Sequence, residues 1–106
     1  MTDAILVITT TANVDDARKI ARALLDQKLA ACVQISGPLE SMYWWQGVVE
    51  TASEWQCVAK TSRDRFAAVE QAITAVHPYQ TPEILAVPIE AGNEKYLRWL
   101  ADELSN

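Results

Sequence analysis

The apolar residues near the start of the chain change from a continuous run to a helical spacing. Residues 4–8, AILVI, form an unbroken aliphatic run, which is typical of a strand that is central in its sheet or covered on both faces. Asn13 is a good N-cap, and the apolar residues after it recur at helical spacing as far as Lys28. The pattern predicts a strand and then a helix that ends near Lys28.

A long hairpin is predicted in the middle of the chain. Its first strand begins at residues 31–35, ACVQI, is interrupted at a Gly-Pro pair and resumes as far as Trp45. A Gln-Gly pair then turns the chain, which returns through a second strand as far as Thr61. The pattern therefore predicts two long antiparallel strands.

The second half of the chain repeats the alternation of helix and strand. A helix is predicted from residue 62 or 63 to residue 76, because Pro78 biases the residue before it out of the α region. Residues 83–89, EILAVPI, are predicted to form the fourth strand, and Pro88 indicates that no neighbour accepts a hydrogen bond at that end. A last helix opens at Asn93.

The order of these elements predicts the fold. Two strand–helix–strand halves joined by the hairpin, each with a right-handed crossover, give a four-stranded antiparallel sheet with two helices on one face. This is the ferredoxin-like arrangement of the α+β class, with an extra C-terminal helix. Because the chain has 106 residues and 50% hydrophobic content, we expect one core and a single domain over residues 1–106.

The hairpin is too long for the rest of the domain. Strands of about 14 residues extend roughly 45 Å, whereas a compact domain of this length is about 33 Å across. Trp44 and Trp45 point to opposite faces of their strand. Whichever faces away from the helices, with Trp55 near it, would be an exposed aromatic patch. We interpret the hairpin as an arm that docks on neighbouring copies; the alternative is one solvent-exposed tryptophan near a loop tip.

The charge of the chain is acidic and its basic residues are scattered. Nine Lys and Arg residues stand against fourteen acidic ones, for a net charge of −5. Because no basic face is available to neutralise phosphates, we expect neither nucleic acid nor an anionic membrane as a partner. The start MTDAILVITT is too short in apolar residues for a signal peptide or a membrane span. We therefore expect a soluble, intracellular protein.

The two cysteines show no metal or redox spacing. If the hairpin turns at its Gln-Gly pair, Cys57 lies opposite Ser36, about 13 Å along the strand from Cys32. A disulfide needs Cα atoms closer than about 7 Å. We therefore expect two free thiols, unless a bulge at Pro38 shifts the register by several residues.

Motifs of familiar enzymes are absent from the sequence. It contains no G-x-S-x-G, no P-loop and no G-x-G-x-x-G. A nucleophilic mechanism would have to use the one histidine, which is held in a His-Pro turn. The loop after the first strand, TTTANVDD, has no glycine for an acylphosphatase-type phosphate cradle. We expect no enzymatic activity.

Several polar residues could form a binding site. The candidates lie on the arm, at the end of its second strand and in the turn after the second helix: Tyr43, Glu50, Lys60, His77, Tyr79 and Glu83. The last three bracket one connection, so they should lie close together, and Lys60 joins them only if the sheet ends coincide. Copper and zinc favour imidazole and thiolate, but His77 has no spaced partner, so two chains would have to complete a metal site. The alternative is that His77 only caps its helix.

Five segments of the chain together resemble the CutA family, which is named for divalent-cation tolerance. They are LAACVQI at 29–35, SMYWWQGVVE at 41–50, the Lys60-Thr61 pair, HPYQTPEILAVPI at 77–89 and YLRWL at 96–100. The resemblance implies a ferredoxin-like protomer in a homotrimer similar to the PII-type signalling proteins, with the sheets joined edge to edge through the long arms. It also implies a cytoplasmic protein associated with copper and other divalent cations.

The resemblance transfers to the site residues only in part. Family members described with a copper site have a cysteine at the end of the first strand and two histidines before the proline, where this chain has Thr9 and Val76-His77. The metal ligands that the resemblance still implies for this chain are His77 and Cys32. Lys60, His77, Tyr79 and Glu83 match recurrent polar positions of the family, which implies a cleft between protomers.

Three functions therefore stand as expectations. The first is a trimer that binds copper or another divalent cation. The second is a PII-like signalling module with a small molecule or anion in the cleft between protomers. The third is a scaffolding trimer with no ligand, and the sequence names no protein partner for any of them.

Overall fold

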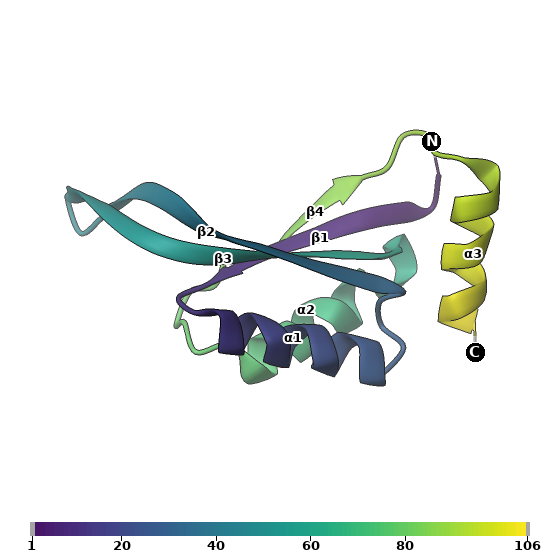
Figure 1. Cartoon of the computed structure of the whole chain (residues 1–106), viewed down its shortest axis with the longest axis horizontal. Helices are drawn as coiled ribbons and strands as arrows, with labels where there is room; N and C mark the ends of the chain where they lie inside the picture. Colours follow the sequence, from purple (N-terminus) through teal and green to yellow (C-terminus); the bar gives the residue numbers. More distant parts are fainter. Residues whose placement is uncertain (1, 106) are drawn as a thin grey trace.

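The computed structural model describes residues 2–105, which form one α+β domain (Figure 1). Its elements in chain order are β1 (Ala4–Thr11), α1 (Val14–Asp26), β2 (Cys32–Trp45), β3 (Val48–Ser62), η1 (Arg63–Arg65), α2 (Phe66–Val76), β4 (Leu85–Pro88) and α3 (Glu94–Ser105). The four strands pair antiparallel in the order β2-β3-β1-β4. This is the strand order of the predicted ferredoxin-like fold.

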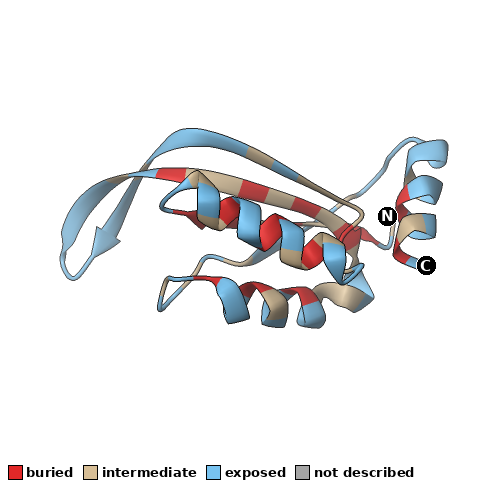
Figure 2. Cartoon of the chain, turned by 60° about the horizontal axis from the view of Figure 1, so that its bottom comes forward, coloured by how far each residue is buried: buried red, intermediate tan, exposed pale blue. Residues whose placement is uncertain are grey.

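Helices α1 and α2 cover one face of the sheet, and the core lies between them and the strands (Figure 2). Alternate residues of β1 and β3 point into this core, as the two-residue period of a strand requires. The fully buried side chains that fill it include Ile5, Val7, Ile20, Leu24, Val69 and Ile73. On α1 the buried residues form the helical stripe that the sequence predicts.

The helix ends follow local signals in the sequence. The Asn13 side chain accepts a hydrogen bond of 2.8 Å from the Asp16 N–H and so caps α1. At the end of α2, Val76 is the last helical residue and His77 has extended backbone, as the following proline requires. Asn93 caps α3 in the same way, accepting 3.0 Å from the Tyr96 N–H. These starts and stops agree with the prediction to within about two residues.

Strand β4 is shorter than predicted, because its next pairing position is already occupied. Ile89 donates to the Ala4 carbonyl at 3.1 Å, and β4 pairs with β1 as far as Leu85 opposite Ile8. Continued at the same register, the ladder would bring the Glu83 N–H to the Thr10 carbonyl. The imidazole of His77 takes that carbonyl instead, so the strand begins only at Leu85 and has four residues.

The predicted overhang of the hairpin is confirmed. Strands β2 and β3 have 14 and 15 residues, and the molecule measures 45 Å along its longest axis against 26 and 22 Å along the others. Their distal half extends past both helices as an arm, here defined as residues 39–54 (Figure 1). Gln46 and Gly47 both have positive φ, 49° and 84°, which is the turn type whose twist matches a two-residue hairpin.

A register shift between Ser36 and Leu39 marks the base of the arm. Gly37 there has φ 154° and lies against Trp55, such that a Cβ on it would be 2.9 Å from two atoms of the indole ring. Trp55 is half-buried and packs against the core. We expected Trp55 beside the exposed tryptophan of the arm; it lies on the core instead, because it pairs with the fully buried Thr11.

The same shift corrects the predicted position of Cys57. Cys57 lies opposite Ile35 and not Ser36, because the irregularity moves the register by one residue. That is too little to bring it to Cys32, and both thiols are free, as expected. Cys57 is buried, its thiol donates to the Ala17 carbonyl at 3.5 Å, and burial raises its pKa to about 11.

Candidate functional site

The turn after α2 holds His77 in a fixed hydrogen-bonded position. The side chain is 9% exposed. Its Nδ1 accepts 3.1 Å from the Tyr79 N–H, and because a backbone N–H can only donate, Nε2 carries the proton. Nε2 lies 2.8 Å from the Thr10 carbonyl and donates to it. His77 does end its helix, as predicted, and both ring nitrogens are occupied by backbone groups.

Tyr79 extends this arrangement to the base of the arm. Its ring lies 4.8 Å from the imidazole, centroid to centroid, and its hydroxyl donates 2.9 Å to a carboxylate oxygen of Glu54 on β3. Glu54 is 9% exposed. Burial, and then the hydrogen bond and the charge of Glu54, raise the pKa of Tyr79 well above its usual range. The phenol therefore stays a donor at neutral pH.

Sequence reasoning missed Glu54. It lies in TASEWQCVAK, where every residue from Trp55 onward belongs to the buried or half-buried part of β3. A carboxylate next to the point where a strand enters the core is costly to bury without a partner. The signal for Glu54 in the sequence is therefore its position directly before the buried part of the strand.

The predicted cleft residues on the arm and in the loop do not form one cluster in a single chain. Tyr43 and Glu50 are cross-strand partners near the tip of the arm, and both are exposed. Tyr79 points to the base of the arm, where it bonds Glu54. Glu83 is exposed in the loop before β4.

Lys60 lies near the C-terminal end of β3, whereas Glu54 lies near the middle of that strand. Six residues separate the two along β3, which is roughly 20 Å at about 3.3 Å per residue. The Lys60 ammonium donates 3.2 Å to the Tyr96 hydroxyl on α3 and lies 5.3 Å from the centre of that ring. The condition under which Lys60 would join the turn residues is therefore not met within one chain.

His77 and Cys32, the two predicted metal ligands, are also at different ends of the sheet. Cys32 pairs with Lys60 on β3, whereas His77 bonds to Thr10, which pairs with Gln56. Lys60 and Gln56 are four residues apart, about 13 Å along the strand. Among residues 2–105 no three His, Cys, Asp or Glu side chains are grouped as metal ligands. The described residues of one chain do not fit a bound copper ion.

The arm is exposed along most of its length (Figure 2), and its large apolar side chains are left uncovered by the chain itself. Trp44 is 75% exposed and pairs with the exposed Val49 on one face; Trp45 is 51% exposed and pairs with the exposed Val48 on the other. Leu85 and Val87 of β4 are exposed as well. Large exposed apolar side chains gathered on one segment in this way mark an interaction site.

Together these features define a ferredoxin-like protein with a long aromatic arm and a buried His–Tyr–Glu turn at its base. No helix within residues 2–105 is long and apolar enough to cross a membrane. Residues 5–103 match the family described as CutA1 divalent ion tolerance protein. The chain therefore belongs to this family, which confirms the resemblance seen in the sequence.

Relatives from distant organisms share most of the chain. The "Divalent-cation tolerance protein CutA" of Archaeoglobus fulgidus is 43% identical over 91 residues, which cover 86% of this chain and 88% of the relative. "Protein CutA 1, chloroplastic" of Oryza sativa is 40% identical over 92% of this chain, which spans only 55% of the rice protein.

Solved structures confirm the fold. CutA of Xylella fastidiosa matches with a TM-score of 0.94 at 36% identity, covering 97% of this chain and 99% of that one. The Archaeoglobus fulgidus structure, described as periplasmic, matches with a TM-score of 0.92 at 39% identity over 95% of this chain and 98% of that one. Relatives are thus named for the chloroplast and for the periplasm, and the cytoplasmic location of this chain stays a prediction. The family is named for cation tolerance and not for a reaction.

Proposed function

We propose that this chain acts in divalent-cation tolerance as a homotrimer whose arms hold the copies together. The observation that carries the proposal is the exposed aromatic surface of the arm, with Trp44 75% and Trp45 51% exposed. Burying such side chains favours association by about 1.5–3 kcal/mol for each large apolar group. That the assembly has three copies is taken from the family resemblance.

The edges of the sheet support the same proposal. β2 is an outer strand of 14 residues, and the opposite outer strand, β4, has only four. A long outer strand presents unpaired N–H and C=O groups that invite pairing with another chain. Edge-to-edge pairing along β2 would satisfy those groups while the arms cover one another.

Sedimentation of the purified protein at micromolar concentration tests the assembly. We expect three times the chain mass for the wild type, and a smaller species for the double variant Trp44→Ser, Trp45→Ser. Trp99→Ser is the matched control, because it removes a half-exposed tryptophan of α3 that lies away from the arm. A monomeric wild type, or an arm variant that remains trimeric, would contradict the proposal.

In this proposal the trimer binds copper or another divalent cation with ligands from more than one copy. Within residues 2–105 of one chain no three His, Cys, Asp or Glu side chains are grouped as metal ligands, and His77 could bind a cation only by giving up one of its two hydrogen bonds. The sequence nominates His77 and Cys32 as ligands. Calorimetric titration of the reduced protein with Cu(II) and Zn(II) should give micromolar or tighter binding that the arm variant loses. Equal binding by the monomeric arm variant would refute shared ligation.

A second function, a PII-like module that binds a small ligand between protomers, is favoured by Glu54. This buried carboxylate receives one hydrogen bond, from Tyr79, and no Lys, Arg or His nitrogen among residues 2–105 lies within 4.0 Å of it. A buried carboxylate of this kind favours a cationic or hydrogen-donating group from outside the chain. The other residues proposed to line this cleft are Tyr43 and Glu50, farther along the arm, and Lys60, Tyr79 and Glu83. Each of the last three is contributed either by the chain that carries Glu54 or by the adjoining copy.

Thermal denaturation with a panel of metabolites tests this second function. A ligand of the cleft should raise the melting temperature of the wild type and leave that of Glu54→Gln unchanged, while both proteins keep the trimer mass. The absence of any ligand-induced shift would count against it. A trimer that captures a partner protein independently of metal and ligand would instead favour the scaffolding function.

A further inference from the structure

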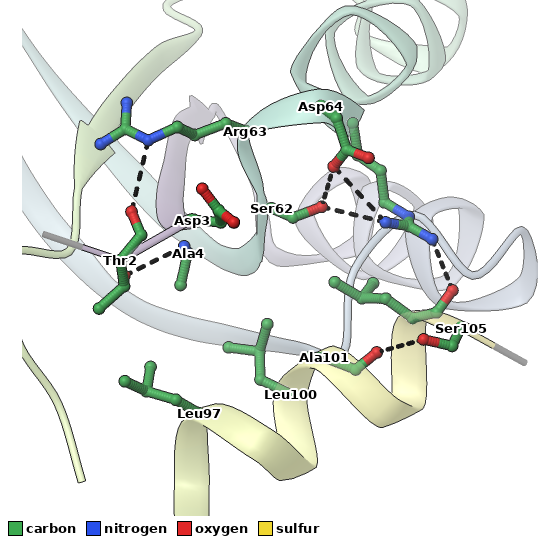
Figure 3. A pocket seen from close by; sticks show the side chains of 12 residues that line it. Thr2, Asp3, Ala4, Ser62, Arg63, Asp64, Leu97, Leu100, Ala101 and Ser105 are labelled. Carbon is green, nitrogen blue, oxygen red and sulfur yellow. Dashed lines mark hydrogen bonds and ion pairs between the residues drawn. The ribbon is translucent and has the colours of Figure 1, made fainter. Parts of the chain in front are cut away.

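A cavity of about 530 Å³ lies at the end of the domain away from the arm. It is enclosed by the start of β1, the end of β3 with η1, and one face of α3 (Figure 3). This size is within the range of small-molecule sites. No residue assigned above to the cation or cleft function lines this cavity. A ligand bound here would therefore be independent of the proposed function.

One wall of the cavity is apolar. It is formed by the inner face of α3, where Leu97, Leu100 and Leu104 line the space. Leu100 and Leu104 are 2% and 4% exposed, so they anchor α3 in the domain, and the half-buried Leu97 offers most of the apolar surface that a ligand could contact. A ligand that fits this wall needs an apolar body.

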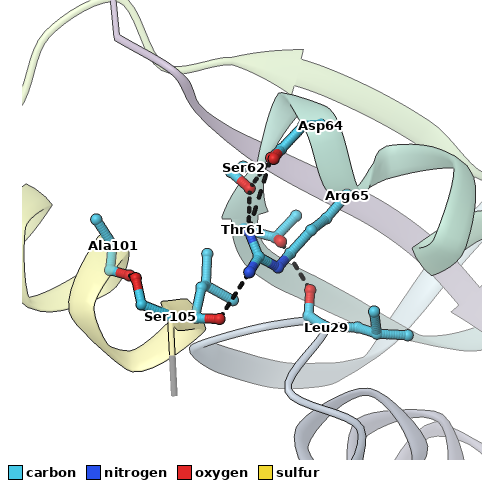
Figure 4. A network of polar contacts seen from close by, with 8 residues as sticks. Leu29, Thr61, Ser62, Asp64, Arg65, Ala101 and Ser105 are labelled. Carbon is cyan, nitrogen blue, oxygen red and sulfur yellow. Dashed lines mark hydrogen bonds and ion pairs between the residues drawn. The ribbon is translucent and has the colours of Figure 1, made fainter.

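Arg65 holds this wall in place. One terminal nitrogen of its guanidinium donates 3.0 Å to the Ser62 hydroxyl and lies 3.6 Å from Asp64, and the other donates 2.6 Å to the Leu104 carbonyl near the end of α3 (Figure 4). These contacts use both terminal nitrogens. Arg65 is therefore a support for α3 and is not available to a ligand.

Arg63 and Asp3 line the same cavity and have no ionic partner among the described residues. The Arg63 side chain donates only through Nε, at 3.4 Å to the Thr2 carbonyl, and none of the ion pairs within residues 2–105 includes it. Its backbone N–H donates 2.8 Å to the Asp3 carbonyl, so the two residues are neighbours at this end of the sheet. The Asp3 carboxylate takes part in no side-chain hydrogen bond or ion pair within that range. Both residues are labelled in Figure 3, across the cavity from Leu97 and Leu100.

We propose that this cavity binds a small zwitterion with an apolar body, of the class of apolar α-amino acids. The ligand carboxylate pairs with the free end of Arg63, the ammonium pairs with Asp3, and the side chain lies on the leucine wall. A simple anion would meet the carboxylates of Asp3 and Asp64, and a simple amine would meet Arg63. Only a ligand with both charges matches both groups.

Three probes that differ by one charge test the pairing. L-Leucine carries both charges, N-acetyl-leucine has lost the ammonium, and leucinamide has lost the carboxylate. In calorimetric titrations of the full chain we expect leucine to bind with a Kd on the order of 1 mM, and each analogue about tenfold more weakly, because a charged hydrogen bond contributes about 1.4 kcal/mol or more. Equal binding of the three probes, or no binding of leucine at about 10 mM, would overturn the proposal.

Two variants assign the charges to their residues. Arg63→Gln should abolish the preference for leucine over leucinamide, and Asp3→Asn should abolish the preference for leucine over N-acetyl-leucine. Both side chains are exposed, so the variants should keep the wild-type melting temperature. Arg18→Gln on α1 is the control for loss of one exposed arginine. Selectivity that persists in both cavity variants would place the ligand elsewhere and refute the assignment.

Discussion

Replacing His77 by alanine should destabilise the fold even when no metal is present. The imidazole links three segments: it belongs to the end of α2, donates to the Thr10 carbonyl of β1, and accepts from the Tyr79 N–H of the following loop. Alanine removes the donor and the acceptor together. It leaves the Thr10 carbonyl without a partner in a region from which water is largely excluded, since His77 is 9% and Thr10 8% exposed.

The expected loss can be assembled from these contacts. The buried Thr10 carbonyl loses its hydrogen bond and stays unsatisfied, which costs about 2 kcal/mol. The half-buried Tyr79 N–H can reach water, so its loss is nearer to about 1 kcal/mol. The ring also loses its contact with Tyr79, about 0.5–1 kcal/mol. We expect His77→Ala to lower the free energy of unfolding by about 3–4 kcal/mol.

Urea unfolding followed by tryptophan fluorescence, at one protein concentration and with a chelator present, measures this loss. The chelator removes any contribution of a bound metal, and the fixed concentration keeps the contribution of assembly the same for variants that form the same oligomer. Gln80→Ala, an exposed position in the same turn, should change stability by less than about 0.5 kcal/mol. His77→Gln keeps a donor and an acceptor and should lose less than alanine. A loss below about 1 kcal/mol for His77→Ala would refute the structural role.

Three further outcomes follow from single contacts. The pKa of Tyr79 is raised by burial and then by its carboxylate partner. Its contribution to the free energy of unfolding is therefore complete below the pKa of an unfolded tyrosine, near 10, and should be lost as the pH rises above about 10. If Tyr79→Phe lost stability at alkaline pH as the wild type does, the prediction would be wrong. With the other cysteine replaced by serine, buried Cys57 should resist a thiol reagent until unfolding, since burial raises its pKa to about 11; rapid labelling of the native protein would show otherwise. Gly37→Ala should lower the free energy of unfolding by about 1–3 kcal/mol, because its Cβ would lie 2.9 Å from the Trp55 ring. Gly47→Ala has open space around it and should lower it by about 1 kcal/mol, for its left-handed φ alone. Equal losses for the two variants would contradict the contact with Trp55.

The elements and the strand order could be predicted because their signals are local. Asn13 caps α1 through a residue three positions away, and Pro78 stops α2 through its immediate neighbour. The hairpin turn depends on two residues with positive φ. Given these elements, right-handed crossovers leave few topologies. The ferredoxin-like sheet could therefore be predicted from the sequence alone.

The partners of His77 could not be predicted in the same way. Its ring bonds the carbonyl of Thr10, 67 residues earlier in the chain, and a backbone carbonyl has no signature in the sequence. The same contact delays the start of β4 to Leu85, so one long-range hydrogen bond accounts both for the position of His77 and for the shortened strand. Glu54 and the one-residue shift before Leu39 likewise depend on how the arm leaves the core.

The two hydrogen bonds of His77 also determine how a metal titration of its variants must be interpreted. A cation at Nδ1 would release the Tyr79 N–H, and one at Nε2 would release the Thr10 carbonyl, so binding there competes with folding. His77→Ala could lose metal affinity simply because the base of the arm is weakened and the trimer dissociates. His77→Gln in trimeric form separates the two causes, because it keeps hydrogen-bonding groups but not the imidazole. Copper binding that the Gln trimer retains and the arm-variant monomer lacks would mean that contact between copies, and not the imidazole, creates the cation site.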